Sequence, residues 1–200
     1  MRTPRLQRGV LQPHRWLSDP GTVMTAIRLA LVYLVALVLQ LTIFVEVRVV
    51  GVAPDLPALI AVLSSLLGGA RRGLVMAFWA GLMWDVYLTT PMGLAAGAFT
   101  VVAYLLGSVT EDLFHDTLMQ TALLAFVGTA AAVTLYALLG EVVGQHGMVD
   151  GDLVRIVAVS SALNAVVSLA VAPALRWALA IRREPRVARP SGFVADIMTR

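Results

Sequence analysis

The stretch TAIRLALVYLVALVLQLTIFV, residues 25–45, carries a single charged side chain, Arg28, near its start. About 20 mostly apolar residues are enough for one helix to cross the hydrocarbon core of a membrane. This stretch is long enough to do so, and Glu46 and Arg48 end it. Across all 200 residues, 59% are hydrophobic and only 14% are charged, whereas soluble domains carry about 25% charged residues. The sequence therefore predicts an all-α, polytopic integral membrane protein and excludes a soluble globular enzyme.

Five more apolar segments follow the first one. Charged residues, glycines or prolines separate them, and only the pair Arg71-Arg72 lies between the second segment and the third. Because this turn is so short, we expect these two segments to form an antiparallel hairpin. The pattern predicts about six transmembrane helices in a membrane domain of residues 25–181, with the later segments at 55–70, 73–89, 93–109, 118–143 and 153–181.

Arginines gather at the two ends of the chain. Residues 1–24 are predicted to form a disordered cytoplasmic tail and residues 182–200 a basic cytoplasmic tail, and Arg71-Arg72 falls on the same side of the predicted membrane domain as both. Cytoplasmic loops carry an excess of basic residues, so the predicted orientation has both termini in the cytoplasm. Basic segments next to a membrane favour anionic lipid. We therefore expect the tails to contact anionic lipid, and we expect no nucleic-acid partner.

The residue types that catalysis needs are sparse. The chain has no cysteine, and its histidines are His14, His115 and His146, without any metal-ligand spacing. Serines on the apolar segments have no nearby base, and small residues of this kind usually mark helix contacts. The sequence predicts no catalytic residue, no cofactor and no metal.

Asp85, in the stretch GLMWDVY at residues 81–87, is the most informative ionisable residue. It lies inside the third predicted segment, where a carboxylate is costly and needs a partner or water. Three interpretations remain open: an acid near the outer interface that reaches water, a structural or partner-facing acid, and a proton-coupling site. Arg48 and Arg155, both expected near the outer side, are the candidate partners within the chain.

The tetrapeptide Pro54-Asp55-Leu56-Pro57 opens the second segment. Asp is a favoured N-cap residue, and a proline in the first helical turn gives up no hydrogen bond. We expect Asp55 to cap this helix, and Pro54 and Asp55 remain candidates for partner binding.

Small residues recur four positions apart in the second to fourth segments and predict close helix packing there. Five aromatic residues cluster in the third and fourth segments. Trp84 and Tyr87 fit an interfacial belt, and the alternative is that the whole set lines an aromatic ligand pocket. The small pairs are Gly69 and Gly73, Ala77 and Gly81, Gly93 and Gly97, and Ala103 and Gly107; the aromatic residues are Trp79, Trp84, Tyr87, Phe99 and Tyr104.

Taken in order, these features resemble the rod shape-determining protein MreD family. The resemblance covers about residues 24–180, and its specific part is confined to residues 54–107. It consists of a Pro-Asp-Leu start (Pro54, Asp55, Leu56), an arginine turn (Arg71, Arg72, Gly73), a Gly-Leu-x-x-Asp stretch (Gly81, Leu82, Asp85) and a Pro-x-Gly-Leu loop (Pro91, Gly93, Leu94) leading to Tyr104 and Gly107.

The resemblance implies a non-enzymatic scaffold of the bacterial cell-elongation and peptidoglycan-synthesis machinery, in the cytoplasmic membrane. Its implied partners are a bitopic MreC-like protein and, directly or through it, MreB and peptidoglycan synthases. MreD proteins also look similar to the substrate-binding subunits of energy-coupling-factor transporters. A vitamin-binding transporter subunit is therefore the alternative function.

Overall fold

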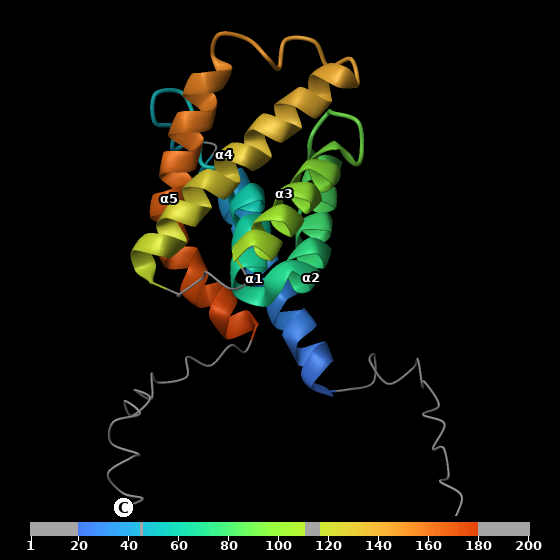
Figure 1. Ribbon diagram of the computed structural model, residues 1–200, viewed down its shortest axis with the longest axis vertical. Helices are drawn as coiled ribbons and strands as arrows, with labels where there is room; N and C mark the ends of the chain where they lie inside the picture. Colours follow the sequence, from blue (N-terminus) through green and yellow to red (C-terminus); the bar gives the residue numbers. More distant parts are fainter. Residues whose placement is uncertain (1–19, 45, 111–116, 180–200) are drawn as a thin grey trace, which may run out of the picture.

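The computed structural model of the protein describes residues 20–44, 46–110 and 117–179. This part of the chain folds into five helices (Figure 1), and four of them are long and apolar enough to cross a membrane. The predicted helical membrane protein is therefore confirmed. The helices are α1 (Pro20–Thr42), α2 (Leu56–Tyr87), the shorter α3 (Leu94–Thr110), α4 (Leu118–Val142) and α5 (Leu153–Ala178).

The prediction of six separate helices is wrong, because the second and third predicted segments form one helical element, α2. This element is interrupted only at Gly69, where φ is 78° and ψ is 167°, angles that favour glycine. A Cβ atom built on Gly73 would lie 2.8 Å from the Ser65 backbone nitrogen, whereas eight residues of straight helix span about 12 Å. The two arms of α2 therefore fold back on each other, and the reversal lies just before the predicted arginine turn (Figure 1).

The other helix boundaries lie close to the predicted ones, except at the start of α1. This helix begins at Pro20, so residues 20–24 of the predicted N-terminal tail are helical. Residues 1–19 and 180–200, which hold the rest of both predicted tails, lie outside the described residues.

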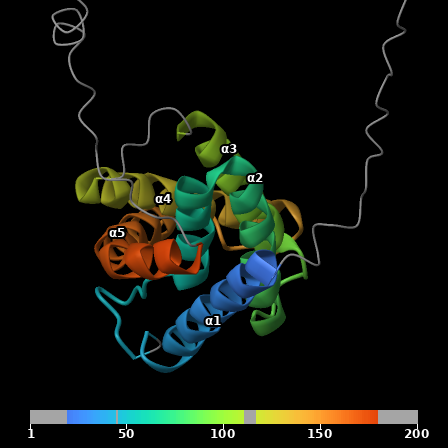
Figure 2. The same cartoon turned by 90° about the horizontal axis from the view of Figure 1, so that it is seen from below.

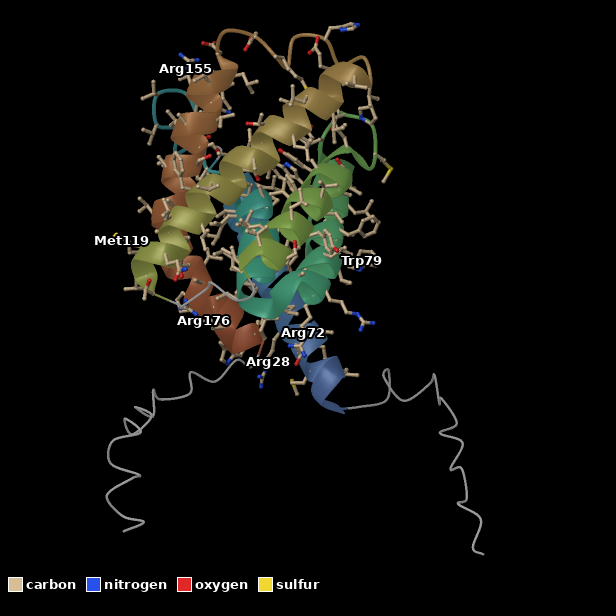
Figure 3. All side chains as sticks on the ribbon, in the orientation of Figure 1. Arg28, Arg72, Trp79, Met119, Arg155 and Arg176 are labelled. Atoms are coloured by element: carbon tan, nitrogen blue, oxygen red, sulfur yellow. The ribbon has the colours of Figure 1, made fainter. Side chains whose placement is uncertain are left out.

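The arginines of the described helices separate toward the two ends of the molecule. The beginning of α1 and the end of α5 lie at the same end (Figure 1). Arg28, Arg72 and Arg176 lie toward that end, and Arg155 lies at the opposite one (Figure 3). The arrangement therefore places both ends of the helical domain together, as the predicted orientation requires.

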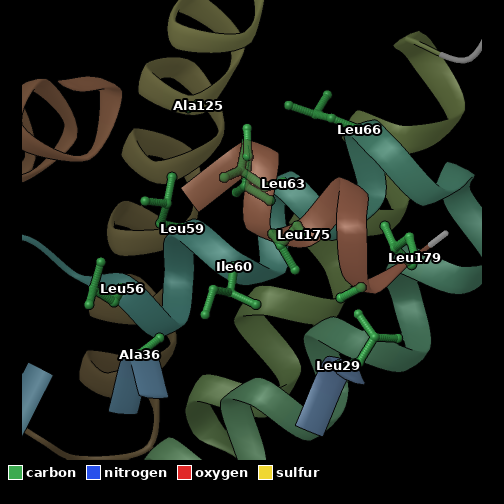
Figure 4. Close-up of a cluster of buried hydrophobic side chains, with 13 residues drawn as sticks. Leu29, Ala36, Leu56, Leu59, Ile60, Leu63, Leu66, Ala125, Leu175 and Leu179 are labelled. Carbon is green, nitrogen blue, oxygen red and sulfur yellow. The ribbon is translucent and has the colours of Figure 1, made fainter. Parts of the chain in front are cut away.

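The first arm of α2 forms the centre of the helix bundle. Every residue from Leu56 to Leu66 is buried, and α1 packs at the edge of the bundle against α2 and α5 (Figure 2). Figure 4 shows the resulting apolar cluster, in which side chains of α2 meet Leu29 of α1, Ala125 of α4 and Leu175 of α5. In a membrane, close packing and internal hydrogen bonds hold helices together more than the hydrophobic effect does. The buried polar residues around this arm can therefore contribute to holding the bundle together.

Candidate functional site

The N-terminus of α2 begins inside the molecule and not at its surface. Asp55 caps this helix, because its Oδ1 atom accepts the Ala58 N–H at 3.0 Å, and this confirms the predicted N-cap. The Asp55 backbone also contacts Asn164, which lies near the middle of α5. The non-helical segment that precedes α2 therefore lies beside the middle of α5.

Two buried amide side chains hold this helix start. Gln40 of α1 donates to the Pro54 carbonyl and accepts the Leu56 N–H, both at 3.0 Å. Asn164 accepts the Asp55 N–H at 3.1 Å, donates to the Asp55 carbonyl at 2.8 Å and approaches the Thr129 hydroxyl of α4 at 3.4 Å. Irregular backbone at membrane depth costs several kcal/mol for each unpaired group. The two amides remove that cost and tie α1, α2, α4 and α5 together.

Asp85 is buried near the end of α2, with an exposed fraction of 1%. Its Oδ1 atom accepts the Ala95 N–H at 2.9 Å, and its Oδ2 atom accepts the Gly93 and Ala96 N–H groups at 3.0 Å. Ala95 and Ala96 belong to the first turn of α3, whose N–H groups have no partner within their own helix, and Gly93 directly precedes that turn. Asp85 is therefore a structural acid that caps the following helix.

This position contradicts two of the expectations for Asp85. A carboxylate that is 1% exposed and holds three backbone donors does not sit at an interface in contact with water. The proposed pairing with Arg155 is also wrong, because the Arg155 guanidinium binds Asp152 at 3.1 Å on the surface. Arg48 lies exposed after α1 and is not among the hydrogen-bond partners of Asp85.

The end of α2 packs directly on the backbone of α3 at Gly81. A Cβ atom on Gly81 would lie 2.7 Å from the Ala95 carbonyl carbon, so no larger residue fits there. At the other end of the pair, a Cβ atom on Gly107 would lie 2.8 Å from the Ala70 Cα atom. Both glycines thus allow the close packing that the small-residue pattern predicts.

Gly93 and Gly97 have different roles. Gly93 adopts a positive φ of 97° in the turn before α3 and donates its N–H to Asp85. Gly97 is exposed, and a Cβ atom there would meet no atom within 4 Å. The expectation that Gly97 packs within the chain is therefore wrong, because its face of α3 is open.

A cavity of about 40 Å³ lies among α2, α3 and α4. It is lined by Asp55, Trp84, Phe99, Val133 and Tyr136, and the Tyr136 hydroxyl donates to the Thr90 Oγ1 atom at 3.1 Å. Trp84 also stacks on Tyr87, with ring centroids 5.5 Å apart. Of the two residues predicted for the interfacial belt, Tyr87 is exposed, as a belt requires, whereas Trp84 is half-buried and lines the cavity together with Phe99. The other two aromatic residues of the set, Trp79 and Tyr104, are exposed.

Sequence reasoning missed Gln40, Asn164 and Tyr136 as members of this region. Gln40 and Asn164 are uncharged polar residues inside long apolar segments, and this is the signal that could have identified them. Within the described part of the chain, no cluster of His, Asp and Glu side chains could hold a metal ion.

Comparison with known protein families gives one match. A family described as rod shape-determining protein MreD matches residues 21–179. No curated protein and no solved structure matches the chain. The predicted likeness to the substrate-binding subunits of energy-coupling-factor transporters therefore has no support from these comparisons.

Proposed function

The chain belongs to the rod shape-determining protein MreD family, and we propose that it acts as a non-enzymatic membrane scaffold of the bacterial cell-elongation and peptidoglycan-synthesis machinery. In this proposal it is a multi-pass protein of the cytoplasmic membrane that regulates cell shape through helix contacts. The observation that carries the proposal is that three buried polar side chains hold the protein's own helices together and are not directed at a ligand. Asp85, Gln40 and Asn164 all bind the backbone of the chain itself.

The proposed direct partner is a single-span, MreC-like protein. In this proposal, MreB and peptidoglycan synthases bind the chain either directly or through that partner. The small residues Gly73, Gly81 and Gly107 do not receive the partner helix, because the chain's own backbone fills the space beside them. Gly97 has open space instead, and Val101 and Leu105 follow it at helical spacing with exposed fractions of 47% and 55%. We define Gly97, Val101 and Leu105 as the α3 face.

The α3 face suits a transmembrane helix for two reasons. A glycine at an exposed position lets a second helix approach closely. In addition, α3 has 17 residues, about 26 Å of helix, against a hydrocarbon thickness of about 30 Å. Because α3 is shorter than the hydrocarbon layer is thick, the backbone next to its ends would otherwise face lipid. A partner helix lying along α3 would cover that backbone.

In the proposed orientation, both termini lie in the cytoplasm. The positions of Arg28, Arg72 and Arg176 toward the end where α1 begins and α5 ends support it (Figure 3). The N- and C-terminal tails, for which we propose contacts with anionic lipid, lie outside the described residues except for the start of α1. Pro54, Asp55, Arg48 and Arg155 remain candidates for contacts with a partner on the outer side.

The alternative, a vitamin-binding transporter subunit, needs a larger pocket than the cavity beside Asp55. Small-molecule sites usually enclose about 300–1,000 Å³, whereas the cavity beside Asp55 encloses about 40 Å³. This cavity is therefore too small to hold a vitamin.

Site-specific crosslinking tests the α3 face, because the chain contains no cysteine and any introduced thiol is unique. A photoactivatable maleimide on Val101→Cys or Leu105→Cys should capture the MreC-like protein in native membranes. Leu34→Cys on α1 and Leu123→Cys on α4 are matched controls, since these positions are 56% and 60% exposed. Capture from the controls but not from the α3 face would refute the proposed docking position.

A further inference from the structure

The cavity beside Asp55 combines one carboxylate with three aromatic rings. Its lining residues are Asp55, Trp84, Phe99, Val133 and Tyr136, and none of them is basic. The Asp55 Oδ1 atom caps α2, and a carboxylate has further acceptor sites on both oxygens. Aromatic rings present a negative face that attracts cations. The lining is therefore complementary to a small positive group.

The dimensions and hydrogen-bonding groups select the kind of cation. A volume of about 40 Å³ accommodates a group of a few heavy atoms. A primary ammonium has three donors, and both the Asp55 carboxylate and the Tyr136 hydroxyl oxygen can accept from it. The Tyr136 oxygen keeps its lone pairs because it donates its own proton to Thr90. The chain contains no lysine, so none of its side chains carries a primary ammonium group.

Entry to the cavity is open in part. Asp55, Trp84, Val133 and Tyr136 are half-buried, and Phe99 is the only fully buried lining residue. Trp84 lies near the end of α2 and Tyr136 near the end of α4. Both of these helices end toward the end of the molecule at which α5 begins (Figure 1). A group arriving from the membrane interface at that end can therefore reach it.

We propose that this cavity binds one primary ammonium group, carried either by a free small amine or by the ethanolamine headgroup of a phospholipid. This site is separate from the α3 face and does not depend on the scaffold function. The carboxylate supplies the charge, and the Trp84 and Tyr136 rings cover the carbon next to the nitrogen.

Methylammonium is the probe that tests the site, added at constant ionic strength to the full chain in phosphatidylglycerol nanodiscs. Binding is followed by calorimetry on the parent chain and by the fluorescence of Trp84 in a variant whose Trp16, Trp79 and Trp177 are replaced by phenylalanine. Asp55→Asn keeps an N-cap acceptor for Ala58 but removes the charge. Asp152→Asn is the matched control, since it removes an exposed carboxylate at the start of α5.

Saturable binding is expected in the parent chain and in Asp152→Asn, and about tenfold weaker binding in Asp55→Asn and in Trp84→Leu. If phosphatidylethanolamine in the nanodisc weakens methylammonium binding, the lipid headgroup is the ligand; if it has no effect, the ligand is a free amine. Absence of saturable binding, equal binding by Asp55→Asn, or equally effective competition by potassium would overturn the proposal.

Discussion

The Asp85 Oδ2 atom accepts the Ala96 N–H at 3.0 Å, and this hydrogen bond joins the end of α2 to the start of α3. Gly93 and Ala95 donate to the same carboxylate. A helix N-terminus carries unpaired N–H groups and a partial positive charge, so an acid stabilises it in both respects. The unusual feature is that the acid belongs to the preceding helix. The angle between α2 and α3, and with it the position of the α3 face, therefore depends on Asp85.

Replacing Asp85 should destabilise the membrane domain. Asp85→Leu leaves three N–H groups without their acceptor, two of them buried, and should cost about 3 kcal/mol. Asp85→Asn should fall between Leu and the parent, because both carboxylate oxygens are acceptors here and an amide offers only one. Thermal unfolding in detergent, followed by helical circular dichroism, measures the difference. Asp152→Asn is the control and should change stability by less than about 1 kcal/mol; an equal loss in the control would contradict this role of Asp85.

Gly81 and Gly97 form a matched pair for separating internal packing from partner binding. Gly81→Leu should prevent α2 and α3 from packing, because its side chain would meet the backbone at Ala95 and Ala96, and should cost about 3 kcal/mol or more. Gly97→Leu projects into open space and should unfold within a few degrees of the parent, while weakening recovery of the MreC-like partner. Unfolding temperature and copurification are measured on both variants. Normal partner recovery by Gly97→Leu would argue against the α3 face.

Asn164 provides a test of the buried helix start. Asn164→Leu has a similar volume but leaves the Asp55 N–H and carbonyl unpaired, at a cost of about 2–3 kcal/mol. Ser168→Ala, one turn further along α5, loses only a local bond to the Ala165 carbonyl and should be mild. The thermal unfolding midpoints of the two variants give the comparison. If Ser168→Ala is as damaging as Asn164→Leu, general packing of α5 explains the effect.

The proposed orientation predicts where reporters are active. A periplasmic reporter fused after Arg200 should be silent, and the same reporter inserted at Gly147, in the loop between α4 and α5, should be active. Enzyme activity of the reporter in intact cells is the measurement. Strong activity of the Arg200 fusion would place the C-terminus outside and refute the orientation.

Local features of this fold could be predicted from the sequence, since neighbouring residues determine them. The Asp55 cap is one example, because the acceptor and its donor at Ala58 are three positions apart. Helix boundaries follow the apolar runs for the same reason. The continuity of α2 could not be predicted because Arg71 and Arg72 interrupt the apolar run and suggest a loop. In the structure the chain reverses at the single residue Gly69, and both arginines lie within the helix.

Contacts between distant residues could not be predicted in this way. Asn164 and Asp55 are 109 positions apart, and no local pattern indicates that they meet. The partners of Asp85 could not be predicted for a different reason, since they are backbone N–H groups, which residue types do not reveal. The free N–H groups of the next helix satisfy a buried carboxylate equally well.

Cell shape after depletion of the protein in rich medium tests the central claim most directly. A scaffold of the elongation machinery leaves cells rounded or wider when it is lost, whatever nutrients are supplied, and re-expression of the parent chain should restore the rods. Phase-contrast microscopy of cell width and length during depletion measures this outcome. Rod-shaped cells in rich medium, with a growth defect confined to vitamin-free medium, would contradict the scaffold and support the transporter subunit.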